Sequence, residues 1–164
     1  MALKIVRDAN KNRALLEPFA PFTRYSRQDL DLDLRVLSND GSDAALVRQA
    51  FNLTKSNMKL AFAHFRFEVE ADEPTLYVYD IQISPQAQRR GLGRFLMQLI
   101  ELIAWRVGMT NVMLTVFEGN QGGRRLYEAL GYVKSIDSPD YGVERSDKGY
   151  SILRKQKPLP RNKA

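Results

Sequence analysis

A glycine turn flanked by basic side chains is the segment of this sequence best suited to chemistry. It spans residues 88–93, Gln-Arg-Arg-Gly-Leu-Gly, between a strand-like run and a helix-like run. A helix that follows such a turn presents unpaired backbone N–H groups at its N-terminus, where an anion can bind. The two glycines carry no side chain to block a phosphate, and Arg89, Arg90 and Arg94 add positive charge. The turn is therefore predicted to hold a pyrophosphate.

A second group of chemical side chains precedes the turn on two strand-like runs. Glu68 and Glu70 share one face of the run over 61–70, because alternate residues of a strand point to the same side. Tyr77 and Tyr79 share a face of the next run. Together these residues place acidic and aromatic groups on two consecutive strand-like runs. The alternative to a chemical role is the solvent-facing side of a sheet, where alternating glutamates and exposed phenol hydroxyls are ordinary.

Hydrophobic periodicity predicts the elements that position both groups. Strands alternate with helices in the second half of the chain, which indicates a mixed α/β fold. The predicted elements are a helix over 2–16, strands over 30–36, 60–69, 75–83, 111–117, 132–136 and 149–155, and helices over 42–58, 95–105 and from 120 to 130–131.

Composition excludes several kinds of site. The 164 residues contain no cysteine and one histidine, His64, so disulfides, thiolate catalysis and cysteine or histidine zinc cages are all excluded. No apolar run reaches membrane-spanning length, and an intracellular soluble protein is expected. Part of the net charge of +6 lies in the two terminal segments. Solvated ends are favoured over a nucleic-acid site as the explanation of that charge.

With these elements in order, the sequence resembles the GNAT superfamily of acetyl-CoA-dependent N-acetyltransferases. Residues 81–85 and 88–93 resemble its CoA pyrophosphate loop, of pattern Gln/Arg-x-x-Gly-x-Gly/Ala, 114–116 its next strand, and 120–132 its second cofactor motif. A Rossmann site would need an acidic residue about twenty positions after the glycine turn, and 108–111 contain none. The resemblance implies an α/β (α+β) GNAT fold with a mixed, mostly antiparallel central sheet flanked by helices.

The resemblance also implies that acetyl-CoA is the co-substrate and that no metal takes part. The backbone of Ile81 and Ile83 would hold the acetyl carbonyl and pantetheine, and Tyr127 would be the general acid for the CoA thiolate. Packing of Tyr127 against the core is an equal alternative, and Asn120 also suits a helix cap. The implied cofactor-binding residues are Ile81, Gln82, Ile83, Gln88, Arg89, Arg90, Gly91, Leu92, Gly93, Arg94 and Asn120.

A closer resemblance is to the NatD family of N-alpha-acetyltransferases, which acetylate the N-terminal serine of histones beginning Ser-Gly-Arg-Gly. The matching runs are 52–58, 61–70, 76–80, 112–117 and 149–153. This resemblance implies a GNAT domain over 18–155, between a helical and basic extension over 1–17 and a basic tail over 156–164 that is expected to be disordered. It further implies histone tails as partners, no membrane or direct nucleic-acid role, a monomer, and a nuclear and cytoplasmic location.

By the same resemblance, the side chains that contact the tail are Glu68, Glu70, Tyr77, Tyr79 and Tyr150. Asp80 falls where the family has a carboxylate near the amine, which would steer proton removal through water. Asp80 and Tyr127 are thus the expected catalytic residues.

The sequence departs from the NatD family after Met58. The family has the rest of a helix, a loop and a central strand there, with a tyrosine and a tryptophan of the peptide pocket, whereas only Lys59 and Leu60 precede Ala61 here. The shortened acceptor region predicts an unpaired sheet edge, or pairing of that edge with residues 30–37. It leaves open a weak enzyme, an inactive isoform or a mistaken gene model. Two other functions remain open: a GNAT acting on lysine or small amines, and a non-catalytic acyl-CoA-binding or histone-binding module.

Overall fold

A computed structural model describes residues 1–27, 29–37, 61–142 and 148–159 of the chain. The chain divides into two compact units. The first unit comprises Met1–Asn10, Phe65–Tyr79 and Ala104–Ala164, and the second comprises Lys11–His64 and Asp80–Ile103. Each unit is described by itself.

Within the described residues, five strands form the main sheet, in the order β3-β4-β5-β7-β6. Strand β4 pairs with β5 in parallel, whereas β7 pairs antiparallel with both β5 and β6. The turn between β3 and β4 has positive φ at Ala71 (46°) and Asp72 (64°), the conformation of a type I′ hairpin turn. The strands are β3 (Ala61–Glu70), β4 (Glu73–Ile83), β5 (Asn111–Phe117), β6 (Val133–Lys134) and β7 (Tyr150–Gln156).

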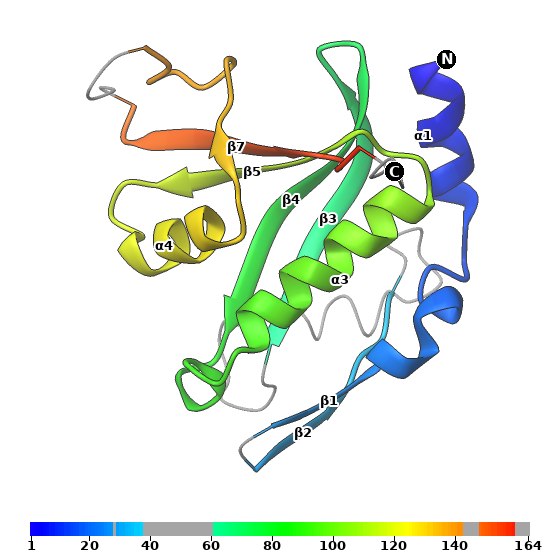
Figure 1. Cartoon of the computed structure of the whole chain (residues 1–164), viewed down its shortest axis with the longest axis vertical. Helices are drawn as coiled ribbons and strands as arrows, with labels where there is room; N and C mark the ends of the chain where they lie inside the picture. The colour runs from blue at the N-terminus through cyan, green and yellow to red at the C-terminus, as the bar shows by residue number, and fades with distance from the viewer. Residues whose placement is uncertain (28, 38–60, 143–147, 160–164) are drawn as a thin grey trace, which may run out of the picture. The chain divides into compact units, whose positions relative to one another are not determined.

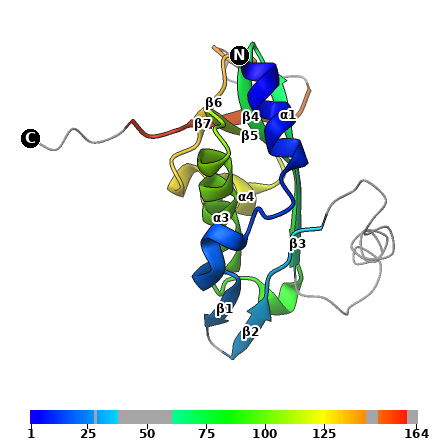
Figure 2. The same ribbon diagram turned by 90° about the vertical axis from the view of Figure 1, so that its right-hand side faces the viewer.

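In the first unit, helix α4 (Gln121–Ala129) lies beside the paired strands β5 and β7 (Figure 1). Three residues of β5, namely Val112, Leu114 and Val116, are at most 2% exposed and form the centre of its core. Helix α1 (Ala2–Lys11) lies along the β3–β4 hairpin (Figure 2), and the side-chain amide of Asn10 donates to the carbonyl of Phe67 at 3.1 Å.

In the second unit, strands β1 (Arg24–Arg27) and β2 (Leu30–Asp33) form an antiparallel hairpin (Figure 1). The unit also contains the 3-10 turns η1 (Glu17–Phe22) and η2 (Pro85–Ala87), and most of helix α3 (Leu92–Arg106). Its apolar cluster joins the hairpin to the start of α3 through buried Tyr25, Leu30, Ala87 and Leu92. This cluster supports the glycine turn, which lies between Ala87 and α3.

The predicted fold class is confirmed: the chain has a mixed α/β arrangement with a mostly antiparallel five-stranded sheet and flanking helices. Strand β5 has the predicted bounds. The N-terminal helix ends at Lys11 rather than 16, because the side chain of Asn12 accepts from the N–H of Ala14 at 2.9 Å and turns the chain. The strand predicted over 30–36 ends at Asp33. The helix predicted over 42–58 lies outside the described residues.

Two strand details differ from the predictions. The sequence predicts a turn over residues 72–74. Asp72 does lie in the turn, together with Ala71, but Glu73 and Pro74 belong to β4. Strand β2 pairs with β1, which the sequence pattern missed, rather than with the edge of the main sheet. Within the described residues, β3 is an edge strand of that sheet. The shortened region predicts either an unpaired sheet edge or pairing of that edge with residues 30–37. Among the described residues, the edge is unpaired.

Candidate functional site

The predicted pyrophosphate loop takes a backbone conformation with positive φ at two residues. Arg89 has φ of 60° and Gly91 has φ of 86°, the left-handed region that glycine adopts without cost. The carbonyl of Gly91 accepts from the N–H of Phe95 at 3.0 Å, so α3 begins immediately after it. The N–H groups of the first turn of a helix have no partner within the helix, which makes this turn suitable for an anion.

Side chains around the loop support the same use. Gln88 donates from its amide to the carbonyl of Ile83 at 2.9 Å and ties the loop to the end of β4. Arg89 and Arg94 are exposed, so both can turn toward a bound anion. The buried hydroxyl of Ser84 has no hydrogen-bond partner in the part of the chain that the structure describes. These features fit a pyrophosphate, and hence the acetyl-CoA that the sequence predicts.

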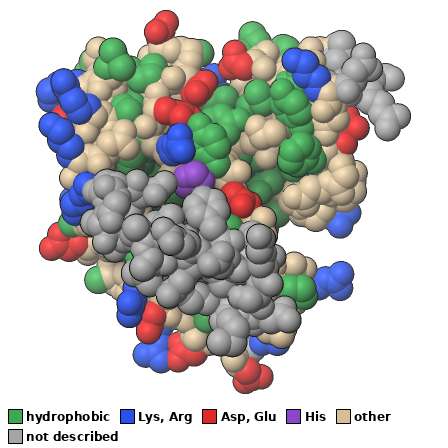
Figure 3. Space-filling model, turned by 180° about the vertical axis from the view of Figure 1, so that it is seen from behind, with side chains coloured by type: hydrophobic (Ala, Val, Ile, Leu, Met, Phe, Trp, Pro, Cys, Tyr) green, Lys and Arg blue, Asp and Glu red, His purple; other side chains and the backbone are tan. Residues whose placement is uncertain are grey.

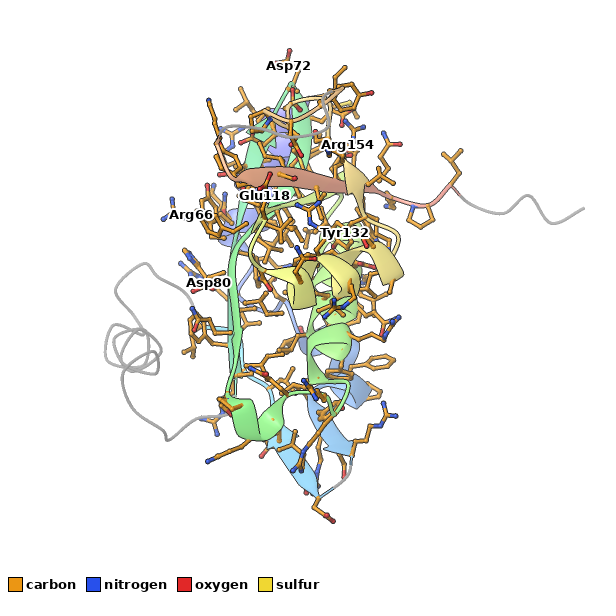
Figure 4. All side chains as sticks on the ribbon, turned by 90° about the vertical axis from the view of Figure 1, so that its left-hand side faces the viewer. Arg66, Asp72, Asp80, Glu118, Tyr132 and Arg154 are labelled. Atoms are coloured by element: carbon orange, nitrogen blue, oxygen red, sulfur yellow. The ribbon has the colours of Figure 1, made fainter. Side chains whose placement is uncertain are left out.

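The end of β4 lies next to this loop and extends past its registered pairs with β5. The pairing of β4 with β5 runs from Thr75 to Val78, whereas β4 itself continues to Ile83. Ile81 and Ile83 thus lie beyond the registered pairs with β5, and their role in binding the acetyl carbonyl and pantetheine stays a prediction. Asp80 projects from β4 on the side away from α3 (Figure 4), and Gln82 donates to its carboxylate at 3.4 Å.

The first unit contains a pocket of about 370 Å³ that brings four predicted substrate residues together. On its face of the molecule, acidic side chains adjoin an apolar surface (Figure 3). The lining residues are Glu68, Glu70, Tyr77, Tyr79, Met113, Thr115, Asp137 and Ile152. The predicted grouping of two glutamates and two tyrosines is therefore present in the structure.

Hydrogen bonds and ring contacts fix the aromatic side of the pocket. The Tyr79 hydroxyl donates to the carboxylate of Glu68 at 3.0 Å, and the guanidinium carbon of Arg66 lies 5.2 Å from the centre of the Tyr79 ring. The rings of Tyr77 and Tyr79 are 5.1 Å apart, and the Tyr77 hydroxyl bonds to that of Thr115 at 2.7 Å. The two phenols are thus held in place by neighbours on β3 and β5.

Three carboxylates give the pocket an acidic character. Partial burial raises the pKa of Glu70, and the negative charges of Glu68 and Asp137 raise it further. Burial also raises the pKa of Tyr77 and of Tyr79, so both phenols stay neutral donors at pH 7. Like charges that oppose one another's ionisation favour a cationic ligand.

The remaining predicted residues lie around helix α4 and strand β7 of the first unit. Asn120 caps α4, because its side-chain oxygen accepts from the N–H of Gly123 at 2.9 Å. Tyr127 is 5% exposed and packs edge-on against Tyr132 at 6.0 Å between ring centres. Tyr150 is partly buried, pairs with the ring of Phe117 at 6.5 Å, and does not line the pocket.

The sequence missed several residues of both sites. Asp137 lines the pocket from the loop after β6, and no local pattern predicts that this loop returns to β3. Tyr25 and Arg27 lie against the glycine loop from a hairpin that was not predicted. Among the described residues, no cluster of three or more acidic, histidine or cysteine side chains could hold a metal ion. No described helix is long and apolar enough to cross a membrane.

Comparisons with known proteins point to one family. The model of the Acetyltransferase (GNAT) family matches residues 13–132, more than half of the chain. N-alpha-acetyltransferase 40 of Saccharomyces cerevisiae is 34% identical over 77 residues, which are 43% of this chain and 27% of that protein. The ribosomal protein bS18-alanine N-acetyltransferase of Escherichia coli K12 is 39% identical over 92 residues, 56% of this chain and 59% of that protein. The chain thus spans less than two thirds of either relative.

Solved structures show the same fold. A GNAT family acetyltransferase from Listeria monocytogenes has a TM-score of 0.54 at 11% identity, over 82% of this chain and 99% of that one. The PaiA N-acetyltransferase of Thermoplasma acidophilum, solved in complex with coenzyme A, has a TM-score of 0.50 at 15% identity, over 71% of this chain and 72% of that one.

Proposed function

The chain belongs to the acetyltransferase (GNAT) family, and from this premise we propose that it transfers acetyl from acetyl-CoA to the N-terminal serine amine of histone tails beginning Ser-Gly-Arg-Gly. Acetyltransferases of this family use acetyl-CoA. The observation that carries the choice of acceptor is the acidic and aromatic pocket, in which Glu68, Glu70 and Asp137 surround a volume of about 370 Å³. An arginine two residues after the acetylated serine would give these carboxylates a cation to pair with.

An N-terminal amine suits the weak bases that this chain offers. Its pKa is near 8, against about 10.4 for lysine, so it reaches the neutral form far more easily at pH 7. Asp80 is our candidate base. It projects from β4 with its carboxylate held by the Gln82 amide at 3.4 Å, and it would take the amine proton through a water molecule.

When bound, acetyl-CoA supplies a thioester that an amine attacks directly. The new bond joins the amine nitrogen to the acetyl carbon, and the carbon–sulfur bond breaks. The chain has no cysteine to carry the acetyl group in a covalent intermediate, in agreement with direct attack. Tyr127 is the candidate that donates a proton to the departing thiolate, with protonation by water as the alternative.

The names of relatives support an N-terminal acceptor. The yeast relative is called an N-alpha-acetyltransferase and the bacterial one acetylates an alanine. We extend the proposal to histone tails as partners and to a nuclear and cytoplasmic location. The shortened region after Met58 makes low activity, or binding without turnover, the main alternative.

The test is acetyl transfer to four peptides, read by mass spectrometry. One begins Ser-Gly-Arg-Gly, a second begins Ser-Gly-Ala-Gly, a third begins with alanine, and a fourth has a blocked N-terminus and an internal lysine. We expect N-terminal acetylation of the first peptide, with a lower rate for the second because the pocket loses its cation. Equal rates for the first two peptides would remove the assigned role of the acidic pocket.

The other outcomes identify the alternatives. Acetylation of the lysine peptide alone, or of a polyamine in a parallel reaction, would replace the proposal with a lysine or small-amine acetyltransferase. Acetylation of the alanine peptide alone would change the acceptor. Calorimetric binding of acetyl-CoA or of the Ser-Gly-Arg-Gly peptide without any product would indicate a non-catalytic binding module.

A further inference from the structure

The hairpin of the second unit contacts the glycine loop through one tyrosine. Tyr25 of β1 is 7% exposed, and its hydroxyl donates a hydrogen bond to the carbonyl of Arg90. Its ring lies 4.9 Å from that of Phe95 in α3, and it shares an apolar cluster with Ala87 and Leu92. Tyr25 thus touches the loop itself and packs with residues on both sides of it.

The hydrogen bond from Tyr25 fixes the direction of a peptide group in the loop. The described chain has no cis peptide bond, and in a trans peptide the C=O and the following N–H point in opposite directions. With the Arg90 carbonyl held toward the hairpin, the N–H of Gly91 points away from it. The carbonyl of Gly91 is fixed separately by the N–H of Phe95 at 3.0 Å. Both peptide groups around Gly91 are therefore oriented.

A second side chain of the hairpin lies against the same glycine. Arg27 Nη1 is 2.8 Å from the position that a Cβ on Gly91 would occupy, and the Tyr25 hydroxyl is 3.2 Å from it. Arg27 is exposed. Its guanidinium adds positive charge to that of Arg89 and Arg94 from a different element of the chain.

We propose that Tyr25 is a positioning residue for the pyrophosphate site, because it directs the N–H of Gly91 toward the bound anion. Arg27 adds a smaller, long-range attraction for the same anion. This inference rests on the proposed binding of acetyl-CoA by the glycine loop. It gives the β1–β2 hairpin a role in cofactor binding, although Tyr25 and Arg27 lie outside the glycine-loop motif.

The test substitutes Tyr25→Phe, which removes the hydroxyl and keeps the ring in the apolar cluster. Binding is measured by calorimetry with CoA and with pantetheine, which lacks the pyrophosphate. We expect the affinity for CoA to fall about fivefold, because the loss of one hydrogen bond weakens binding by about this factor. The affinity for pantetheine should not change. In turnover assays the KM for acetyl-CoA rises and kcat stays the same. Tyr141→Phe, at a tyrosine that is 53% exposed, is the matched control.

A second variant separates positioning from stability. Phe95→Leu removes the ring contact of Tyr25 but leaves its hydroxyl, so the melting temperature should fall while the ratio of CoA to pantetheine affinity is kept. Unchanged CoA affinity in Tyr25→Phe, or equal losses for CoA and pantetheine, would overturn the inference. Absence of CoA binding by the unmodified protein would overturn the proposed function and, with it, this inference.

Discussion

The glycine loop of the second unit and the acidic pocket of the first unit are both suited to charged partners, but they are built differently. The loop carries arginines and leads into the N-terminus of α3, which suits the predicted anion, and it has a φ of 86° at Gly91. The pocket presents carboxylates and phenols, and its lining comes from the four strands β3, β4, β5 and β7 and from the loop that contains Asp137. Substitutions in the loop should therefore act through backbone shape, and substitutions in the pocket through charge.

The largest loss of stability is expected at the loop after β6, which contributes Asp137 to the pocket. Asp140 is 4% exposed, lies 2.7 Å from the ammonium of Lys134 and accepts hydrogen bonds from Ser138 and Ser151. Asp140→Asn replaces this buried anion with an amide and leaves Lys134 without its charge partner. We expect the free energy of unfolding to fall by about 3 kcal/mol, measured by urea denaturation at pH 7.

The pH dependence of that variant gives a second check. Burial alone would raise the pKa of Asp140, but hydrogen bonds from Lys134, Ser138 and Ser151 outweigh it and lower the pKa below its usual value. The stability that this carboxylate provides is thus present above about pH 4 and is lost as the pH falls through the lowered pKa. The difference in the free energy of unfolding between the Asp140→Asn variant and the unmodified protein should therefore become smaller at acidic pH. Asp8→Asn, at an exposed pair with Lys4, should cost only tenths of a kcal/mol.

The next effect tests the backbone shape of the glycine loop. Gly91→Ala places a Cβ 2.8 Å from Arg27 Nη1 and forces a left-handed conformation on alanine, at a cost of about 1–2 kcal/mol. We expect affinity for CoA to fall about tenfold in calorimetry. Gly142→Ala has a similar φ of 74° but open space around its Cβ. It should lose similar stability and bind CoA normally. If both variants bind CoA equally well, the loop does not depend on Gly91.

The glycine loop and the acidic pocket also differ in how far the sequence predicts them. The loop is a run of consecutive residues. Its glycines favour the observed conformation and its arginines supply the charge, so the sequence alone predicted it. The alternation of Glu68 with Glu70 likewise predicted a shared face on one strand, and that of Tyr77 with Tyr79 a shared face on the next. Asp137 could not be found, because its place in the pocket depends on the tertiary path of the chain after β6.

The strands likewise differ in whether their own sequence or contacts with distant residues determine them. Strand β5 was predicted with its bounds, since alternating valine and leucine residues and a flanking glycine mark it locally. Strand β1 was missed, because its sequence Arg-Tyr-Ser-Arg has no apolar alternation. It is a strand through pairing with β2 and through burial of Tyr25, and both depend on residues outside the segment.

The role of charge in the acidic pocket is tested by removing two carboxylate charges while keeping the shape of the side chains. In the double variant Glu68→Gln and Glu70→Gln, each glutamine keeps an oxygen, including one that can accept from Tyr79. We expect kcat/KM for a Ser-Gly-Arg-Gly peptide to fall about tenfold relative to Ser-Gly-Ala-Gly, with CoA affinity unchanged. Glu17→Gln, at an exposed residue of the second unit, is the control. A loss shared equally by both peptides would count against recognition of a cation.

The same double variant carries an expectation for stability. Burial and the charges of Glu68 and Asp137 raise the pKa of Glu70, so its ionised form disfavours folding. A raised folded pKa gives stability that is present at low pH and lost as the pH rises. The melting temperature of the variant should therefore be slightly higher than that of the unmodified protein at pH 7, and equal to it near pH 3. A lower melting temperature at pH 7 would show that the carboxylates stabilise the fold.

The smallest effect concerns Asn120, for which a cap and a cofactor contact are both open. Its oxygen accepts from the N–H of Gly123 at 2.9 Å, and a Cβ on Gly123 would lie 2.6 Å from its amide nitrogen, so this cap needs a glycine there. Asn120→Ala should cost about 1 kcal/mol and lower the melting temperature by about 2–4 °C. Asn120→Ser retains a capping oxygen and should recover most of this loss. If serine restores stability but CoA affinity falls equally in both variants, Asn120 binds the cofactor. If affinity is unchanged in both, its role is confined to the helix, and recognition of the anion then depends on the glycine loop without this residue.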